Sequence, residues 1–300
     1  MIAPYNKPPL ETIRTAYRSI SIFSTEGKNI DDSVVKAFGD EWLKFQHYSN
    51  DDIRSLAIMY FDILNDIIVN KNCYALDIGC GTGRWTKYLS DRLGFIEAID
   101  PSNAVLAADH LLKDVSNVRI TKAAVDTIPF NDETFDFVMS VGVLHHIPDT
   151  QQAMNDCVKK AKKGGYFYCY LYYNLDNKNF LFKILFRVSD LIRKIVSRMP
   201  ERLKRFSCDL MAIFFYMPFV LTSRLLNLIG LKKWARKIPL SDYANKSFFI
   251  IRNDTLDRFG TKLEQRFSKK QVEEMMKQSG LTNIIISPSS PYYHAIGQKV

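Results

Sequence analysis

Long uninterrupted hydrophobic runs are absent from this 300-residue sequence. No segment has the roughly 18 consecutive apolar residues that a membrane-spanning helix requires, so we expect no such helix. The opening residues contain no apolar core of signal-peptide length. The sequence also has no internal repeat and no low-complexity segment. These absences argue against an integral membrane protein, an exported protein and a repeat architecture.

Cysteine is scarce as well. The five cysteines are scattered, are odd in number and show no metal-ligand spacing; they are Cys73, Cys80, Cys157, Cys169 and Cys208. Neither a disulfide framework nor a metal site is therefore predicted, and the reducing cytoplasm is the expected location. The composition, 47% hydrophobic and 24% charged, is that of a globular chain with one elaborated domain or a core plus a subdomain.

Acidic residues are rare in one segment, residues 178–237. Fourteen lysines and arginines there face only three acidic residues, a net charge of +11 within a chain whose total is +9. The basicity therefore belongs to this segment and not to the whole fold. Residues 180–199 space their charges three and four apart, as on one face of an amphipathic helix. Residues 210–223 carry no charge, but they are too few to span a bilayer and Pro218 interrupts them.

Three interpretations of the basic segment remain open. The first is a helical cap on the core with a solvated basic face. The second is an element that lies on an anionic membrane surface, which would suit a lipid-linked acceptor and a peripheral position on the inner face of the membrane. The third, nucleic-acid binding, is least favoured, because the charge is present without a recognisable binding module.

Strands and helices alternate from residue 73 onward, which predicts a parallel sheet with helical crossovers. The expected strands are residues 73–78, 96–99, 118–123, 135–141 and 166–173, and the expected helices are residues 84–93, 103–112 and 150–161. A capping-box helix, residues 268–279, and two strands, residues 283–287 and 294–298, follow later. We therefore expect an α/β, doubly wound, mostly parallel seven-stranded sheet with a helical insertion between strands 5 and 6.

This pattern divides the chain into four parts. Residues 1–72 form an N-terminal helical extension, which includes a helix over residues 52–69, and residues 73–173 form the core. Residues 174–262 form the basic helical insertion, an expected cap over an acceptor. Residues 263–300 complete the core with a helix and antiparallel strands.

A glycine-rich loop, Gly79-Cys80-Gly81-Thr82-Gly83, follows the first core strand. Glycine lets backbone approach a ligand closely, because no Cβ stands in the way. A dinucleotide-binding fingerprint would place the third glycine one residue later. Asp77, two residues before the loop, would also repel a pyrophosphate. A carboxylate there suits a ligand with an ammonium group, such as S-adenosylmethionine (SAM).

Asp100 ends the second core strand, about 20 residues past the first glycine, where an acid can accept hydrogen bonds from a ribose; the alternative is a helix cap. Further motifs are Ile128-Pro129-Phe130, Phe135-Asp136-Phe137-Val138 and Leu144-His145-His146-Ile147-Pro148-Asp149. In this order, and with the glycine loop, they resemble the class I SAM-dependent methyltransferases, particularly the ubiquinone/menaquinone-biosynthesis type. The resemblance covers residues 73–173 and implies a Rossmann-like methyltransferase fold.

The resemblance also implies a site for S-adenosylmethionine. Gly79, Cys80, Gly81 and Gly83 would line its amino-acid end, with Asp77 near the ammonium, Asp100 on the ribose, and Ser140 and Val141 beside the methionine part. Relatives often have an acid where this chain has Ala124. The adenine would therefore be bound by backbone groups of Ala124 and Val125, with Asp126 as the alternative.

The implied function is transfer of a methyl group from SAM to a small-molecule, sugar or lipid-linked acceptor. If the acceptor must lose a proton, the candidate bases are His146, which is favoured, and His145. Both follow the fourth core strand, at the edge where open α/β sheets bind ligands. The alternative is that both residues only pack or turn the loop. Two other functions remain open: a SAM-binding protein without turnover and a nicotinamide-dependent reductase.

Overall fold

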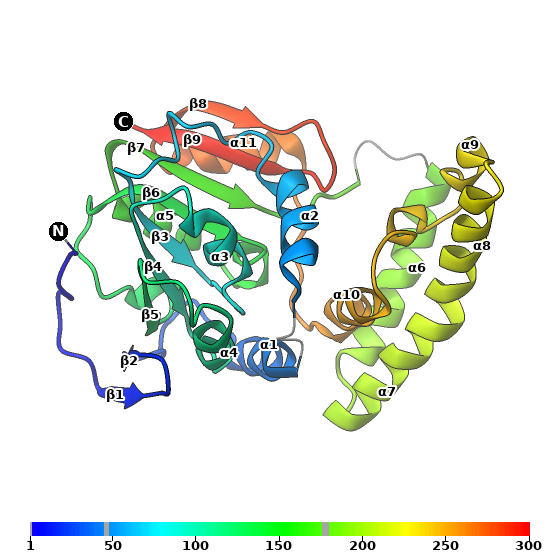
Figure 1. Cartoon of the computed structure of the whole chain (residues 1–300), viewed down its shortest axis with the longest axis horizontal. Helices are drawn as coiled ribbons and strands as arrows, with labels where there is room; N and C mark the ends of the chain where they lie inside the picture. Colours follow the sequence, from blue (N-terminus) through cyan, green and yellow to red (C-terminus); the bar gives the residue numbers. More distant parts are fainter. Residues whose placement is uncertain (1, 45–47, 176–179) are drawn as a thin grey trace. The chain divides into compact units, whose positions relative to one another are not determined.

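The computed structural model describes residues 2–44, 48–175 and 180–300 of the chain. These residues form two compact units (Figure 1). The first unit contains Met1–Asp176 and Leu263–Val300, and the second contains Asn177–Lys262. The first unit holds the sheet, whereas the described elements of the second are all helical.

The first unit is built on a nine-stranded sheet in the order β1-β2-β5-β4-β3-β6-β7-β9-β8. Its strands are β1 (Glu11–Arg14), β2 (Ser19–Ile22), β3 (Tyr74–Ile78), β4 (Phe95–Asp100), β5 (Val118–Lys122), β6 (Phe135–Val141), β7 (Ala161–Tyr170), β8 (Leu281–Ile286) and β9 (His294–Lys299). Strands β3 to β7 pair in parallel, whereas β9 runs antiparallel to both β7 and β8. The predicted doubly wound, mostly parallel α/β sheet is confirmed.

The predicted count of seven strands is wrong by two. Strands β1 and β2 form an antiparallel hairpin, and β2 extends the sheet by pairing in parallel with β5. Each of the two strands has only four residues, and every residue of β1 is exposed. The alternation of serine and isoleucine in β2 is only four residues long, and β1 has no buried side chain, so the sequence gives only a weak strand signal here.

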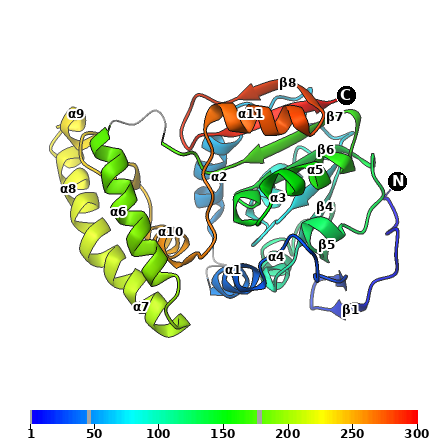
Figure 2. The same cartoon turned by 180° about the vertical axis from the view of Figure 1, so that it is seen from behind.

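Helices cover both faces of the sheet, so the first unit has three layers (Figure 1, Figure 2). Side chains of α2 (Asn50–Tyr60), α3 (Arg84–Ser90) and α4 (Ala104–Leu111) share one hydrophobic core with Ala75 and Phe137. Side chains of α5 (Thr150–Lys160) and α11 (Lys269–Gln278) share the other core with Leu76 and Val138. Since consecutive residues of one strand enter different cores, the central strands are apolar on both faces.

Two predicted elements differ from the structure by more than three residues at one end. The helix expected over residues 52–69 ends at Tyr60; beyond it, Asn65 accepts hydrogen bonds from the N–H groups of Ile67 and Ile68 in a separate turn. The strand expected over residues 166–173 runs from Ala161 to Tyr170. The strand begins five residues before the predicted start because Ala161 already pairs with Phe135 of β6. A register shift then follows between Phe135 and Phe137.

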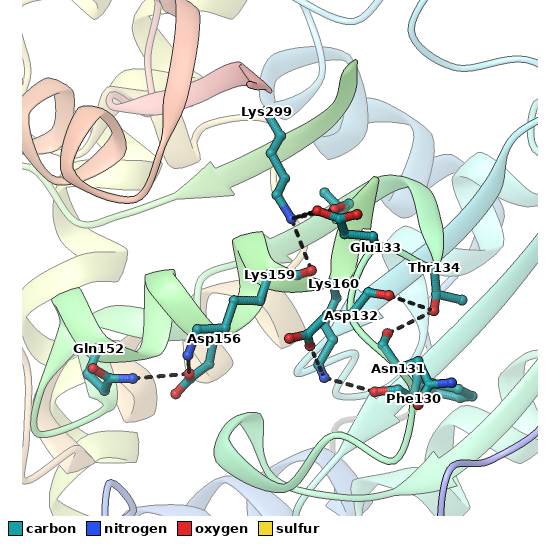
Figure 3. A network of polar contacts seen from close by, with 11 residues as sticks. Phe130, Asn131, Asp132, Glu133, Thr134, Gln152, Asp156, Lys159, Lys160 and Lys299 are labelled. Carbon is teal, nitrogen blue, oxygen red and sulfur yellow. Dashed lines mark hydrogen bonds and ion pairs between the residues drawn. The ribbon is translucent and has the colours of Figure 1, made fainter. Parts of the chain in front are cut away.

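Polar contacts fix the loop before β6 at the amino edge of the sheet (Figure 3). Lys160, the last residue of α5, pairs with Asp132 at 2.7 Å. Lys299, at the end of β9, donates to the carbonyl of Lys159 at 3.2 Å and lies 3.6 Å from Glu133. These contacts tie β6, α5 and β9 together. This edge, opposite the one where the parallel strands end, therefore serves the stability of the fold.

The second unit consists of α6 (Phe180–Val196), α7 (Glu201–Met211), the π-helical turn η3 (Ala212–Tyr216), α8 (Met217–Leu228), α9 (Lys232–Ala235), η4 (Ser241–Tyr243) and α10 (Phe248–Gly260). Elements α7, η3 and α8 continue as one helix, Glu201–Leu228 (Figure 1). The expectation that Pro218 interrupts this stretch is wrong. Proline has no N–H group, so Pro218 cannot donate the hydrogen bond that a regular helix needs at this position. The π-helical turn directly before Pro218 lets the helix continue without that bond.

The same helix corrects the expectation that no segment could cross a membrane. By length and composition alone, Glu201–Leu228, with 28 residues, is long and apolar enough to do so, and it is the one such helix among the described residues. Only 22% of its most apolar window is buried within the protein.

A buried ion pair between β4 and β5 offers a test of the first unit. The carboxylate of Glu97 is buried and accepts two hydrogen bonds from the Arg119 guanidinium, both at 2.8 Å, and one from the Tyr74 hydroxyl at 2.5 Å. We expect Glu97→Ala to lower the free energy of unfolding by about 3–5 kcal/mol, because it leaves a partly buried cation without its partner. Thermal and denaturant unfolding of the full chain measure this loss.

The control for this test is Glu274→Ala, at an exposed ion pair in which Lys270 lies 3.8 Å away. Exposed pairs of this kind contribute little to stability, so the unfolding midpoint should stay that of the unmodified chain. Equal midpoints for the two variants would contradict the importance of the buried pair.

Candidate cofactor and active site

The order of the strands places the candidate site. Strand β3 lies between β4 and β6. The chain builds the sheet from β3 toward β4 and β5 on one side, and then toward β6 and β7 on the other, so the strand order reverses at β3 (Figure 1). Ligands of open α/β sheets bind at the carboxyl ends of the strands around such a switch point. The glycine loop follows β3, Asp100 ends β4, and the two histidines follow β6. The structure thus brings most of the predicted site residues to one edge.

The glycine loop is bonded to the end of β4. The N–H groups of Gly79 and Cys80 both donate to the Ile99 carbonyl, at 2.8 and 2.9 Å, and the N–H of Gly81 donates to Oδ2 of Asp100 at 3.0 Å. Gly79 has a φ of +75°, and a Cβ there would lie 2.5 Å from Cγ2 of Val143. No side chain fits at this position, so glycine is required by conformation and by space.

Asp100 combines two structural roles at the end of β4. Besides accepting from the loop, the buried carboxylate accepts from the N–H of Ser102 at 2.8 Å and from its hydroxyl at 2.6 Å. These bonds form the turn that leads into α4, but Asp100 is not the helix cap considered from the sequence, because the N-cap residue of α4 is Asn103. Each carboxylate oxygen can accept more than one hydrogen bond, so Asp100 retains capacity for a further donor.

Asp77 is a buried carboxylate with one unused oxygen. It is 1% exposed, and its Oδ2 accepts from the Thr86 hydroxyl at 2.5 Å. Its Oδ1 has no hydrogen-bond partner among the described residues, and neither has the buried hydroxyl of Thr82 in the glycine loop. Burial raises the pKa of Asp77 to about 7, against the opposing effect of the Thr86 hydrogen bond. An acceptor and a hydroxyl with unused capacity fit a ligand such as SAM, which carries an ammonium group.

Three further predicted residues are buried beside the loop. The hydroxyl of Ser140 donates to the carbonyl of Ile78 at 3.0 Å, so it links β6 to β3. Val141, which ends β6, is buried as well. Burial raises the pKa of the Cys80 thiol well above its usual value, so this thiol stays protonated. Cys80 contributes backbone and volume to the site, not a thiolate.

The predicted adenine-binding residues form a short 3-10 turn, Val125–Thr127, after β5. Ala124 and Val125 are buried, and Ala124 exchanges hydrogen bonds with Thr127 through its N–H at 3.3 Å and its carbonyl at 3.1 Å. Asp126 instead contacts the N-terminal segment: its Oδ2 accepts from the N–H of Asn29 at 3.2 Å, and it packs closely on Gly27. The carboxylate of Asp126 is thus held by the N-terminal segment, unlike the other predicted acids.

His145 is enclosed by the protein. Its ring is buried and stacks on Tyr172 with 3.9 Å between ring centroids. Neither ring nitrogen has a hydrogen-bond partner among the described residues. Burial, with smaller contributions from His146 and Arg266, lowers the pKa of His145 well below 6.5. This histidine is therefore neutral and is a poor proton acceptor.

His146 is oriented by a residue far away in the sequence. Its Nδ1 lies 2.7 Å from the carbonyl oxygen of Leu263, which can only accept a hydrogen bond. The proton of the neutral ring is therefore on Nδ1, and the basic lone pair is on Nε2. The ring of Phe38 packs against this histidine at 4.8 Å. Of the two candidate bases, His146 has the arrangement that a general base needs.

Helix α1 (Asp32–Lys44) also contributes to this edge. A Cβ on Gly81 would lie 3.3 Å from Nε1 of Trp42, so the indole covers the glycine loop. Gly39 packs on Ser102, and Phe38 packs on His146. One helix therefore contacts the segments that follow β3, β4 and β6. The spacing of Phe38 and Trp42, four residues apart, was the available signal.

An aromatic cluster next to the histidines was missed from the sequence. Tyr170, the last residue of β7, lies 6.3 Å from the ring of His145 and 4.9 Å from the ring of Tyr60. The first residue of β9, His294, pairs with Tyr170 across the sheet and contacts Asp62 at 2.6 Å. These side chains line the carboxyl edge next to His145.

Comparison with known families agrees with this geometry. Residues 76–169 match the family model described as a methyltransferase domain. The matched segment runs from β3 into β7 and contains the glycine loop, Asp100 and both histidines. This segment of the first unit is therefore similar to the class of proteins that contain a methyltransferase domain.

Within that class, the segment is similar to demethylmenaquinone methyltransferases. The protein of that name from Shouchella clausii is 30% identical over 114 residues, which are 36% of this chain and 48% of that protein. The one from Staphylococcus aureus strain MRSA252 is 32% identical over 111 residues, or 36% and 46%. The chain spans about half the length of these curated relatives. A solved SAM-dependent methyltransferase from Aquifex aeolicus is 14% identical, with a TM-score of 0.46 over 85% of this chain and 100% of that chain.

The assignment of Asp77 to an ammonium group predicts that ligand affinity depends on pH. Only the ionised carboxylate can pair with an ammonium group, and with a pKa of about 7 its ionised fraction rises as the pH increases. We expect affinity for S-adenosylhomocysteine, which shares the ammonium group of SAM, to rise by roughly an order of magnitude between about pH 6 and about pH 8. Isothermal titration calorimetry across this range measures the effect.

Two variants make this test specific. Asp77→Asn removes the titrating group, so its affinity should be weak and independent of pH. Asp114→Asn, on an exposed residue, should retain the full pH dependence of the unmodified chain. A pH profile that Asp77→Asn leaves unaltered would rule out the assignment of Asp77 to the ammonium.

Proposed function

We propose that this protein transfers a methyl group from S-adenosylmethionine to a small-molecule acceptor. The observation that carries the proposal is the buried Oδ1 of Asp77, which lacks a hydrogen-bond partner among the described residues and lies beside a glycine loop bonded to β4. The methyltransferase match over residues 76–169 supports it. When bound, the cofactor supplies a methyl group made electrophilic by the adjacent sulfonium.

In this proposal the residues of the chain bind the cofactor and orient it for methyl transfer. Asp77 accepts from the ammonium of the cofactor, and Asp100 accepts from the ribose hydroxyls. Gly79, Cys80, Gly81 and Gly83 line the amino-acid end, and Ser140 and Val141 lie beside the methionine part. Backbone groups of Ala124 and Val125 contact the adenine; the contact between Asp126 and residue 29 argues against Asp126 in this role. Such alignment is the main contribution a protein makes to an in-line displacement.

We propose His146 as the general base for an acceptor that must lose a proton. Its lone pair on Nε2 follows from the hydrogen bond between Nδ1 and Leu263. His145, which is neutral and stacked on Tyr172, supports the loop instead. Carboxyl and carbonyl partners commonly orient catalytic histidines in this way.

The acceptor is proposed as a small molecule, with sugars and lipid-linked compounds included. Relatives named demethylmenaquinone methyltransferase support this class. The five cysteines are all free and buried, as expected of a protein that works in the reducing cytoplasm.

The activity is tested by incubating the full chain with SAM and fractionated bacterial metabolites, and by measuring S-adenosylhomocysteine. Production that depends on one fraction is the expected result. Binding of SAM without production in any fraction would favour a binding protein without turnover. A melting temperature raised by NAD and not by SAM would contradict the proposal in favour of a reductase.

His146→Asn tests the base. The asparagine amide can still donate to the Leu263 carbonyl, but it has no basic lone pair in place of Nε2. We expect kcat to fall by about 10²-fold or more, as for other lost general bases, with the affinity for S-adenosylhomocysteine unchanged. His110→Asn, on the exposed part of α4, is the control and should keep full activity. Full turnover by His146→Asn would remove the base assignment.

A further inference from the structure

Exposed apolar side chains are concentrated in the second unit. Of the 29 exposed large hydrophobic side chains among the described residues, 19 belong to Asn177–Lys262, which holds fewer than a third of the residues of the chain. Scattered single residues of this kind are normal on a protein surface. A concentration in one small unit marks a surface that contacts something apolar.

Ten of these 19 side chains lie on the 201–228 helix, and seven of the ten share one side of it. Residues three, four and seven apart are between 37% and 84% exposed: Leu203, Phe206, Leu210, Phe214, Leu221, Leu225 and Leu228. This spacing places them on one side of the helix, which we call the apolar stripe. The opposite side is buried at Cys208, Ala212, Val220 and Ser223. It packs on α10 through Ile251 and Phe259.

Positive charge flanks the apolar stripe at both ends. Arg198 and Arg202 are exposed near its start, and Lys232, Lys233, Arg236 and Lys237 are exposed just beyond its end. No acidic residue occurs from Leu210 to Ser241. Of the acids that border this range, Asp209 is engaged by the guanidinium of Arg252 at 2.8 and 2.7 Å, and Asp242 is exposed. The surface therefore combines an uncharged apolar strip with basic ends.

We propose that the second unit binds an anionic lipid bilayer through the apolar stripe, with the 201–228 helix lying in the plane of the interface. An apolar face flanked by lysine and arginine is what such a helix presents to anionic headgroups. Trp234, 61% exposed within the basic cluster at 232–237, is the side chain that favours the headgroup region. This proposal goes beyond methyl transfer and does not depend on it.

The buried side of the helix rules out a spanning orientation in this fold. It packs on α10, which contributes Arg252, paired with Asp209 of α7, and the Asp254 carboxylate, 3.5 Å from Lys246. A helix that crossed the bilayer with α10 attached would take these charges into hydrocarbon, where charged groups are costly. Lying flat, the helix immerses only the apolar stripe.

Charge also argues against a second copy of the chain as the occupant. Two helices that met stripe to stripe would bring basic ends next to basic ends in either a parallel or an antiparallel arrangement. Like charges so placed repel each other. An anionic lipid surface neutralises both ends at once.

The test is flotation of the full chain, without SAM, with vesicles of phosphatidylcholine alone or of phosphatidylcholine mixed with phosphatidylglycerol. We expect binding to the anionic vesicles only, weakened by salt. Phe214→Glu/Leu221→Glu, on the apolar stripe, should reduce binding at least about tenfold. Its control, Ile67→Glu/Leu106→Glu, changes two exposed apolar residues of the first unit and should bind normally. Lys232→Gln/Lys233→Gln should reduce binding about fivefold per charge removed.

Three outcomes would overturn the proposal. The first is absence of binding to either kind of vesicle at low salt. The second is equal binding by the stripe variant and its control. The third is a dimer of the unmodified chain that Phe214→Glu/Leu221→Glu converts to a monomer, which would assign the stripe to a second copy.

Depth separates a flat helix from a spanning one. Residue 214 is near the middle of the 201–228 helix. In Phe214→Trp, a flat helix keeps the added indole near the headgroups, where lipids brominated close to the headgroup quench it best. Quenching strongest with bromine at the ends of the acyl chains would place residue 214 at the bilayer centre and contradict the flat orientation.

Discussion

The hydrogen bond from the N–H of Gly81 to the carboxylate of Asp100 is the contact on which the rest of the site depends. Together with the two N–H groups that share the Ile99 carbonyl, it fixes the glycine loop to the end of the neighbouring strand. These three donors are used within the protein, so they are not available to a pyrophosphate. What the loop offers a ligand instead is close approach of its backbone and the unused oxygen of Asp77. This distribution of donors and acceptors suits a cationic ligand better than an anionic one.

The loop that carries His145 and His146 is held in place by residues that follow the second unit in the sequence. The carbonyl of Leu263 orients His146, and the N–H of Gln265 donates to the carbonyl of His145 at 3.0 Å. The side chain of Gln265 also donates to the carbonyl of Ile147 at 2.7 Å. The position of the proposed base is therefore set by residues more than a hundred positions later, after the second unit has been completed. The candidate site of the first unit therefore needs both segments of that unit, Met1–Asp176 and Leu263–Val300.

The parts of this molecule that the sequence predicted are those with local causes. Strands β3 to β7 have apolar runs, and the glycine loop has its three glycines at alternate positions, so both could be placed. Ser140 was expected beside the loop, but its bond to the carbonyl of Ile78 depends on the neighbouring strand. The indole of Trp42 over Gly81 and the proton on Nδ1 of His146 likewise depend on partners distant in sequence. The strands of the β1–β2 hairpin, with four residues each, and the π-helical turn before Pro218, with five, are too short to give a clear periodic pattern.

The chain leaves for the second unit and returns from it at a single place in the first. Tyr173 and Phe267 form a bridge, and the N–H of Asn174 donates to the carbonyl of Phe267 at 2.9 Å. The two ends of the segment 175–266 are therefore held together at the sheet, so the strand order does not depend on the length of this segment. Segments joined at such a closed point can be lengthened, shortened or exchanged without altering strand order. In evolutionary terms, the first unit and the second unit of this protein can therefore change at independent rates.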